Sequence, residues 1–475
     1  MPTDERPVAA VATALAPAAV AAIRVSGDGA IDLLATRFSR PGVLRDAAGH
    51  TLHHGVIVTA AGLPVDEVLV AVYRRPRSYT GEEAAEVFCH GSPAGVRRVL
   101  AELLSAGFSA AGPGEFTRRA FLNGKLDLTR AEAVNEVIRA QTTASHALAL
   151  DRLAGSVEAA VREIRGELVA VMAQLAIQLD YPEEETGDVA ADRARLGAAA
   201  YRSREIAATF RAGRLFQEGA RVAIAGRTNA GKSSLFNRLL QHDRSIVSDI
   251  HGTTRDYVES LIDVEGVPVR LFDTAGLRAA TEEIEEEGIR RSRALIAAAD
   301  LVLYVVDALE GVTAEDESRI AEIGETTPVI VLLNKIDALS EGGHAAATRD
   351  PRAAATDSAA PPESRGAPGG TGRPLPVSAV TGDGVADLNR AMLAELLRGD
   401  AADTGVIIDS ERQYALLLRA AEAIDRTIES LDAGMPADAV AVDLQDALDA
   451  VGEITGEVAS AEILDEMFGS FCVGK

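Results

Sequence analysis

The centre of the chain reads G-R-T-N-A-G-K-S from Gly226 to Ser233. This stretch fits G-x-x-x-x-G-K-[ST], in which glycines let the backbone wrap around phosphates and the following helix points its first N–H groups at them. An apolar strand run, Arg221–Ala225, precedes the loop, and an amphipathic helical pattern follows it. In such a loop the lysine, here Lys232, contacts the β- and γ-phosphates, and the Ser233 hydroxyl binds magnesium. Strand, loop and helix in this order predict a phosphate-binding P-loop.

Apolar runs of strand length recur around this loop and alternate with helical patterns. These runs are Arg221–Ala225, Val267–Phe272, Leu301–Val306 and Val329–Leu333. Continuous apolar strands separated by helices are typical of a doubly wound parallel sheet. We therefore expect a P-loop domain over residues 218–398. Inside it, the stretch Ser340–Arg373 is rich in Ala, Gly, Pro, Ser and Asp and has no apolar period, which predicts a disordered loop, 340–373.

The next motifs suit a γ-phosphate and its magnesium ion. D-T-A-G from Asp273 to Gly276 ends a strand run, which places the Asp273 carboxylate near magnesium and the Gly276 N–H near the γ-phosphate. Thr254 is the candidate switch threonine, whose hydroxyl binds magnesium when the γ-phosphate is present. Leu277 is apolar where many GTPases have a water-orienting glutamine, so another group must position the water. The carboxylates near it are Glu282, Glu283, Glu285, Glu286 and Glu287.

Two later motifs point to guanine as the base. N-K-I-D from Asn334 to Asp337 ends the next strand run but one. The carboxylate of Asp337 can accept hydrogen bonds from the N1–H and the exocyclic amine of guanine, a donor pair that adenine lacks. Ser378 and Ala379 follow the strand run Leu375–Val377 and would close over the base. The four motifs in order predict a GTPase, and Asp337 opposes an ATP-dependent kinase or ATPase.

The sequence before residue 126 predicts a mixed domain of strands and helices. Its strand candidates are Ile23–Ser26, Val56–Ala60 and Asp66–Tyr73, and its helix candidate is Ala94–Leu104. From these strand and helix candidates we expect an α+β domain over residues 1–125.

Helical periodicity begins near residue 126 and returns after about residue 400. Thr129 and Glu132 fit a capping box at a helix start. One long amphipathic helix is predicted by the stripe Leu153, Val157, Val161, Ile164, Leu168, Val171 and Leu175. A second stripe is Leu444, Leu448, Val451 and Ile454. We therefore expect an all-α domain split into residues 126–217 and 399–475, with the P-loop domain inserted between them.

Composition limits the class of protein. Of the 475 residues, 47 are Lys or Arg and 72 are Asp or Glu, giving a net charge of −25, which argues against a general nucleic-acid coat protein. Cys89 and Cys472 are the two cysteines, which suits a reducing compartment and excludes a disulfide framework. The apolar run Pro7–Ile23 follows acidic residues and contains Pro17, so we expect neither a signal peptide nor a membrane span. The expected location is the cytoplasm.

These motifs together resemble the MnmE (TrmE) family of bacterial tRNA-modification GTPases, over essentially the whole chain. The stretches that carry the resemblance are Gly226–Ser234, Ile250–Asp256, Asp273–Arg278, Pro113–Phe121, Leu122–Leu128 and Phe471–Lys475. The nucleotide motifs would suit several GTPase families. The loop P-G-E-F-T-R-R-A-F and the terminal F-C-V-G-K are much narrower.

The resemblance implies a folate site in the first domain. In the family this domain binds 5-formyl- or 5,10-methylene-tetrahydrofolate and forms a homodimer, and the matching positions here are Arg24, Glu86, Lys125 and Lys475. Cations suit the glutamyl carboxylates of the ligand, and a carboxylate suits its pterin donors. From the residues alone, Arg24 and Glu86 would be ordinary surface charges.

The resemblance also assigns roles around the nucleotide. It implies a potassium site formed by Asn229, Ser248, Ile250 and Thr253, and magnesium ligands Ser233 and Thr254. Glu285 matches the family's water-orienting glutamate, and Cys472 matches a cysteine implicated in modification. The residues expected to contact GTP are Asn229, Ala230, Gly231, Lys232, Ser233, Ser234, Ser248, Thr253, Thr254, Asp273, Thr274, Ala275, Gly276, Asn334, Lys335, Asp337, Ser378 and Ala379.

The function implied by the resemblance is a potassium-activated GTPase that acts on tRNA. With a flavin-dependent partner, MnmG, in a heterotetramer, it would install an aminomethyl or carboxymethylaminomethyl group at position 5 of the wobble uridine. The one-carbon unit would come from tetrahydrofolate, with FAD and NADH on the partner. A ribosome-assembly GTPase acting as a binding switch is the alternative, because it would share every nucleotide motif.

Overall fold

The chain forms two compact units in a computed structural model that describes residues 6–180, 189–242, 259–273, 294–341, 373–398, 405–458 and 460–475. The first unit comprises Met1–Arg139, Ala149–Arg204 and Arg412–Lys475, and the second comprises Ala140–Leu148 and Glu205–Glu411. The second unit is therefore an insertion in the sequence of the first. Among the described residues, no helix is long and apolar enough to cross a membrane.

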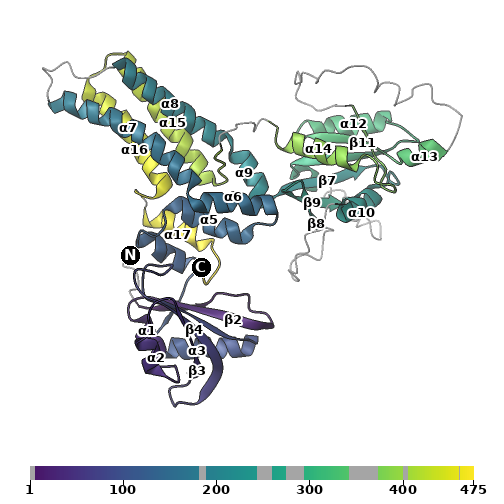
Figure 1. The fold of residues 1–475 in the computed structure, drawn as a ribbon. Helices are drawn as coiled ribbons and strands as arrows, with labels where there is room; N and C mark the ends of the chain where they lie inside the picture. The colour runs from purple at the N-terminus through teal and green to yellow at the C-terminus, as the bar shows by residue number, and fades with distance from the viewer. Residues whose placement is uncertain are drawn as a thin grey trace. The chain divides into compact units, whose positions relative to one another are not determined.

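A mixed sheet forms the N-terminal part of the first unit (Figure 1). Its strands, in the order β3-β4-β5-β2-β1-β6, are β1 (Val8–Val11), β2 (Ala18–Ser26), β3 (Thr51–Val58), β4 (Pro64–Tyr73), β5 (Ala84–Gly91) and β6 (Ser109–Ala110). Its helices are α1 (Ala30–Ala35), α2 (Pro41–Arg45), α3 (Pro93–Ala106) and α4 (Glu115–Leu122). The inward residues of β4, Val68, Val70 and Val72, are buried in one core with α1 and α3. The expected strands and helix are confirmed, each with shifted ends.

Helices make up the rest of the first unit. They are α5 (Leu128–Arg139), α6 (Thr143–Ala154), α7 (Ser156–Asp180), α8 (Val189–Ala208), α15 (Glu411–Asp432), α16 (Ala437–Thr455) and α17 (Ala461–Gly469), with the start of α6 and the end of α8 grouped in the second unit. The predicted stripe from Val157 to Leu175 is buried along α7. Leu153 belongs to α6 instead, because Gly155 takes a φ of 105° and separates the two helices.

The predicted capping box at Thr129 is wrong. The Asp127 carboxylate accepts hydrogen bonds from the N–H groups of Thr129 (2.8 Å) and Arg130 (3.1 Å), so Asp127 caps α5. Glu132 does not turn back to the helix start. Its carboxylate pairs with Arg412 at 2.9 Å and accepts a hydrogen bond from Gln413, which joins α5 to α15.

The second unit contains a doubly wound sheet. Its strands, in the order β12-β11-β10-β7-β9-β8, are β7 (Ala220–Gly226), β8 (Glu259–Val264), β9 (Val267–Asp273), β10 (Leu301–Asp307), β11 (Val329–Asn334) and β12 (Leu375–Pro376). Its helices include α9 (Phe210–Glu218), α10 (Lys232–His242), α12 (Ala314–Gly324), α13 (Ile336–Glu341) and α14 (Val385–Leu396). All strand pairs are parallel except β8 with β9. The predicted sheet is confirmed, and β8 is an additional antiparallel edge strand.

Parallel pairing brings the motif residues to one edge of this sheet. Gly226, Asp273, Asp307 and Asn334 are the last residues of β7, β9, β10 and β11. The carboxyl ends of parallel strands form the ligand-binding edge of such sheets. Of the predicted loop 340–373, the first two residues complete α13, and residues 342–372 lie outside the described part.

Candidate functional site

The P-loop joins β7 to α10 in the conformation that its glycines predict. Gly226 and Gly231 take φ values of 132° and 94°, in the left-handed half of the backbone map. A Cβ atom on Gly231 would lie 2.2 Å from Nδ2 of Asn334, so a side chain cannot fit there. Lys232 is buried and its Nζ donates to the carbonyls of Gly226 (2.9 Å) and Arg227 (2.6 Å). The lysine therefore lies within the curve of the loop.

Ser233 and Asp273 form the pair expected for magnesium. Ser233 lies in the first turn of α10, and Asp273 ends β9, 40 residues later. The Ser233 hydroxyl donates to Oδ2 of Asp273 at 2.9 Å. A hydroxyl and a carboxylate held together beside a phosphate-binding loop fit the oxygen ligands that Mg²⁺ prefers.

The guanine motif is hydrogen-bonded directly to the P-loop. Asn334 is buried, and its Nδ2 donates to the Ala230 carbonyl at 2.9 Å while its Oδ1 accepts from the Ala379 N–H at 3.0 Å. The Ser378 hydroxyl donates to Oδ1 of Asp337 at 2.6 Å. One buried amide thus connects the phosphate loop with the base-closing loop.

Several predicted site residues lie outside the described residues. They are Ser248, Ile250, Thr253, Thr254, Thr274, Ala275, Gly276 and Glu285. The structure therefore describes the phosphate, magnesium and guanine sides of the site through Ser233, Asp273 and the segments around Asn334 and Ser378.

Arg24 is the centre of a second cluster, in the N-terminal domain. Strands β2 and β5 place Arg24 opposite Glu86, and the Nε and Nη2 of Arg24 donate to Oε1 of Glu86 at 3.0 and 2.8 Å. The guanidinium carbon lies 5.7 Å from the ring centre of Tyr79 and 5.6 Å from that of Phe116. Nη1 donates to the Gly474 carbonyl at 3.1 Å. The arginine thus joins a carboxylate, two aromatic rings and the C-terminal segment.

The C-terminal segment is built into this cluster. Val473 forms an antiparallel bridge with Pro113, and the Cys472 carbonyl accepts from the Gly114 N–H at 3.3 Å. Gly474 takes a φ of 94°, and a Cβ atom there would lie 2.4 Å from the Val11 carbonyl oxygen, so glycine is required. The Cys472 side chain is exposed.

Two lysines were also predicted for this site. Burial lowers the pKa of Lys475 below the usual lysine value, and the nearby positive charge of Arg24 lowers it further. Lys125 donates to the carbonyl of Pro76 at 3.3 Å, on the loop that carries Tyr79. The structure brings Lys475 close to Arg24 and Glu86. Lys125 instead contacts the neighbouring loop through Pro76.

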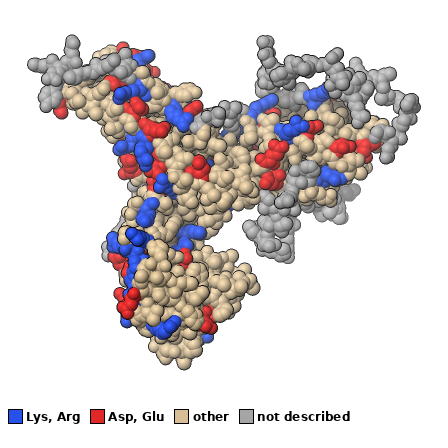
Figure 2. All heavy atoms as spheres, viewed as in Figure 1, with Lys and Arg blue, Asp and Glu red and all other residues tan. Residues whose placement is uncertain are grey.

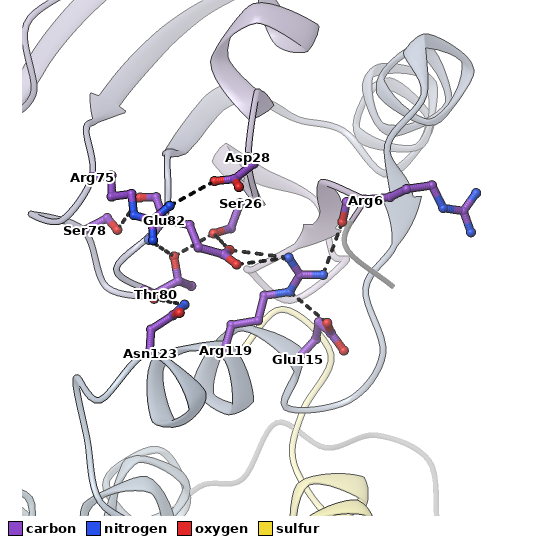
Figure 3. A network of polar contacts seen from close by, with 10 residues as sticks. All are labelled: Arg6, Ser26, Asp28, Arg75, Ser78, Thr80, Glu82, Glu115, Arg119 and Asn123. Atoms are coloured by element: carbon purple, nitrogen blue, oxygen red, sulfur yellow. Dashed lines mark hydrogen bonds and ion pairs between the residues drawn. The ribbon is translucent and has the colours of Figure 1, made fainter. Parts of the chain in front are cut away.

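A buried ion-pair network fixes the loop that carries Tyr79 (Figure 3). Arg119 of α4 is largely buried and contacts Glu115 at 2.8 Å and Glu82 at 3.4 Å. Ser26 donates to Glu82 at 2.8 Å and shares a hydrogen bond of 2.6 Å with Thr80. The network holds the loop against α4, which carries the second aromatic contact of Arg24, Phe116.

Some residues of this cluster were not predicted. Phe116 lies inside the quoted stretch Pro113–Phe121, so that stretch held a signal for it. Tyr79 and Gly474 meet Arg24 only through the fold, because they lie 55 and 450 residues away along the chain. Proximity of this kind has no local pattern in the sequence.

The fold and the nucleotide site define a P-loop GTPase. The sheet presents a P-loop, the contact between Ser233 and Asp273, and a guanine motif at one edge, and a buried asparagine connects the P-loop with the guanine motif. The additional α+β and helical domains set the chain apart from a minimal GTPase, and such domains distinguish one GTPase family from another.

The comparisons place the whole chain in one family. Residues 7–125 match the family model of the GTP-binding protein TrmE N-terminus, and residues 128–472 match that of the MnmE helical domain. The tRNA modification GTPase MnmE of Treponema denticola is 40% identical over 99% of this chain and 98% of that protein. MnmE of Symbiobacterium thermophilum is 39% identical over 99% of this chain and 100% of that protein. The chain belongs to the MnmE family of tRNA modification GTPases.

Family membership confirms the predicted resemblance and, with it, the predicted role of a GTPase in tRNA modification. The chain hydrolyses GTP in tRNA modification. This result favours tRNA modification over ribosome assembly, the alternative that the nucleotide motifs had left open.

Proposed function

We propose that this GTPase is activated by potassium and acts with a flavin-dependent partner of the MnmG type on the wobble uridine of tRNA. The product would carry an aminomethyl or carboxymethylaminomethyl group at position 5. The observation that carries the proposal is the cluster of Arg24 and Glu86 with the Cys472-bearing segment, in the same chain as a GTP site. A ribosome-assembly switch has no use for such a cluster.

The cluster suits a reduced folate such as 5-formyl- or 5,10-methylene-tetrahydrofolate. Arg24 and Lys475 are two neighbouring cations in a partly buried place, and an anionic ligand would offset their repulsion. Glu86 offers a carboxylate to ring N–H donors, and Tyr79 and Phe116 offer aromatic faces to a flat ring. When bound, the folate supplies the one-carbon unit, while FAD and NADH belong to the partner.

A homodimer through the N-terminal domain is part of the proposal. One face of the sheet packs on helices, whereas the other face carries Leu52, Leu69 and Val20, each more than one third exposed. Figure 2 shows a largely uncharged surface over this domain on the side of β2. This face also carries the ion pair of His54 with Glu67, and its exposed apolar side chains favour pairing with a second copy of the same face.

Removing Arg24 or Glu86 should weaken folate binding by the full protein about tenfold or more, because each deletes a charge-assisted contact. Isothermal titration calorimetry of the full-length protein with 5-formyltetrahydrofolate would measure the effect in R24A and E86A. The matched control is R97A, since Arg97 is an exposed arginine of α3 in the same domain. Absence of any heat with the unmutated protein would remove the folate assignment.

Replacing Cys472 by serine should abolish tRNA modification and leave GTP turnover within about twofold, because residues that share no interaction partners act independently. Cys472 lies in the first unit, whereas the P-loop and guanine motif lie in the second. Mass spectrometry of wobble uridines from cells lacking the gene, complemented with the unmutated chain or C472S, would test this. Unchanged nucleosides in the deletion strain would contradict the proposed function, and full rescue by C472S would contradict only the role of the thiol.

A further inference from the structure

The loop after β10 contacts the guanine motif of the nucleotide site. It runs from Asp307 to Thr313, between β10 and α12. The N–H of Ala308 donates to the carbonyl of Asn334 at 2.8 Å, and Oδ2 of Asp307 pairs with Nζ of Lys335 at 2.7 Å. This segment carries none of the motifs that predicted the GTP site, yet it touches the guanine motif by backbone and side chain.

The Asp307–Lys335 pair is held in a defined geometry. Oδ1 of Asp307 accepts from the Leu309 N–H at 2.9 Å, and the Asp307 carbonyl accepts from the Gly311 N–H at 2.9 Å. The carboxyl group of Asp307 is only 15% exposed. Burial alone raises its pKa, but hydrogen bonds from Lys335 and the Leu309 N–H keep this pKa below its ordinary value. These contacts therefore hold the Asp307 carboxylate in its charged form and in one orientation.

The ion pair with Asp307 orients the side chain of Lys335. Its φ of 68° lies in the left-handed region, which is unfavourable for a residue with a long side chain. Its Cε would lie 3.9 Å from a Cβ atom on Gly231, so the alkyl chain passes beside the P-loop. Asp307 anchors the far end of the same side chain. The lysine is thus stretched between the guanine motif and the phosphate loop.

We propose that Asp307 is a positioning residue for nucleotide binding, acting through Lys335. It holds the lysine beside the P-loop, which lowers the conformational freedom that Lys335 would lose when a nucleotide binds. Prior ordering of a binding group increases affinity mainly by slowing dissociation. The Asp307 carboxylate contacts Lys335 and the Leu309 N–H, whereas Ser233 and Asp273 contact each other, so the chemical step should not depend on Asp307.

The test compares Asp307→Asn with a matched surface variant. In D307N, the dissociation rate of a fluorescent GDP analogue and the KM for GTP should rise about tenfold, because the ion pair becomes a hydrogen bond from Lys335 to a neutral amide oxygen. The kcat at saturating GTP should stay within about twofold. The control E315Q removes an exposed acid of α12 that pairs with Arg319, and should change neither quantity by more than about twofold. A fall in kcat with unchanged KM and unchanged dissociation would overturn the proposal.

Two further variants separate positioning from general destabilisation. D307E keeps the charge and should recover most of the lost affinity, whereas equal weakness of D307E and D307N would overturn the role of the carboxylate. If Asp307 acts through Lys335, then D307N should add less than about twofold to the defect of K335Q in a double-mutant cycle. A full additional tenfold loss in the K335Q background would show that the two residues act independently.

Discussion

Replacing Asp337 by asparagine should lower the affinity for GTP by about 100- to 1,000-fold, because a site built to pair with N–H donors rejects a mismatched partner strongly. The Asp337 carboxylate accepts the Ser378 hydroxyl through Oδ1 at 2.6 Å. An asparagine can keep that hydrogen bond with its own oxygen, and its NH₂ group then faces the two N–H donors of guanine. The N–H groups of the asparagine and of guanine cannot hydrogen-bond to each other, so buried polar groups are left without partners.

The same variant should bind xanthosine triphosphate better than the unmutated chain does. Xanthine has a carbonyl oxygen in place of the exocyclic amine of guanine, so the asparagine N–H gains an acceptor. Competition binding with GTP and xanthosine triphosphate would measure both changes. D387N is the matched control, since Asp387 is an exposed aspartate of α14 that pairs with Arg390. An unchanged preference for GTP in D337N would contradict the assignment of the guanine motif.

The nucleotide site could be predicted well because its signals are local. The eight residues from Gly226 to Ser233 contain the turn, the cation and the hydroxyl, and the apolar runs on either side fix the strand and the helix. The bond between Asn334 and Ala230 was not predicted, although both residues were. It depends on the order of strands in the sheet, which the sequence does not state.

The N-terminal cluster shows the opposite case. Arg24 and Glu86 lie 62 residues apart and meet because β2 and β5 pair with those two residues opposite each other. A shift of one residue in this pairing would turn one side chain to the other face of the sheet. Without the family resemblance, no pattern in the sequence selects that register.

Competition between two possible capping residues explains the wrong prediction for the start of α5. Asp127 and Thr129 are both good helix caps, and a propensity rule does not choose between residues two positions apart. The choice of Asp127 leaves Glu132 to pair with Arg412, 280 residues later. A contact between distant segments therefore selects one of two start sites of similar local strength.

Replacing potassium by sodium at equal ionic strength should slow GTP hydrolysis about tenfold or more, because a cation at a desolvated phosphate stabilises the charge of the transition state. Other GTPases often supply an arginine there, with an effect of roughly 10³- to 10⁵-fold. The arginine of the P-loop, Arg227, pairs with Glu310 at 3.0 Å in the structure. Leu277 likewise has no polar group to orient the attacking water.

The residues that would hold potassium include one that the structure describes. Asn229 is exposed on the P-loop with a φ of 65°, and an amide oxygen is a suitable ligand for a monovalent cation. N229A should therefore lose the difference between potassium and sodium while keeping most of its affinity for GTP. E285A should lose turnover even in potassium, since Glu285 is expected to position the water. Phosphate release measured in the two salts would check all three proteins, and equal rates for the unmutated chain would contradict potassium activation without affecting its assignment as a GTPase.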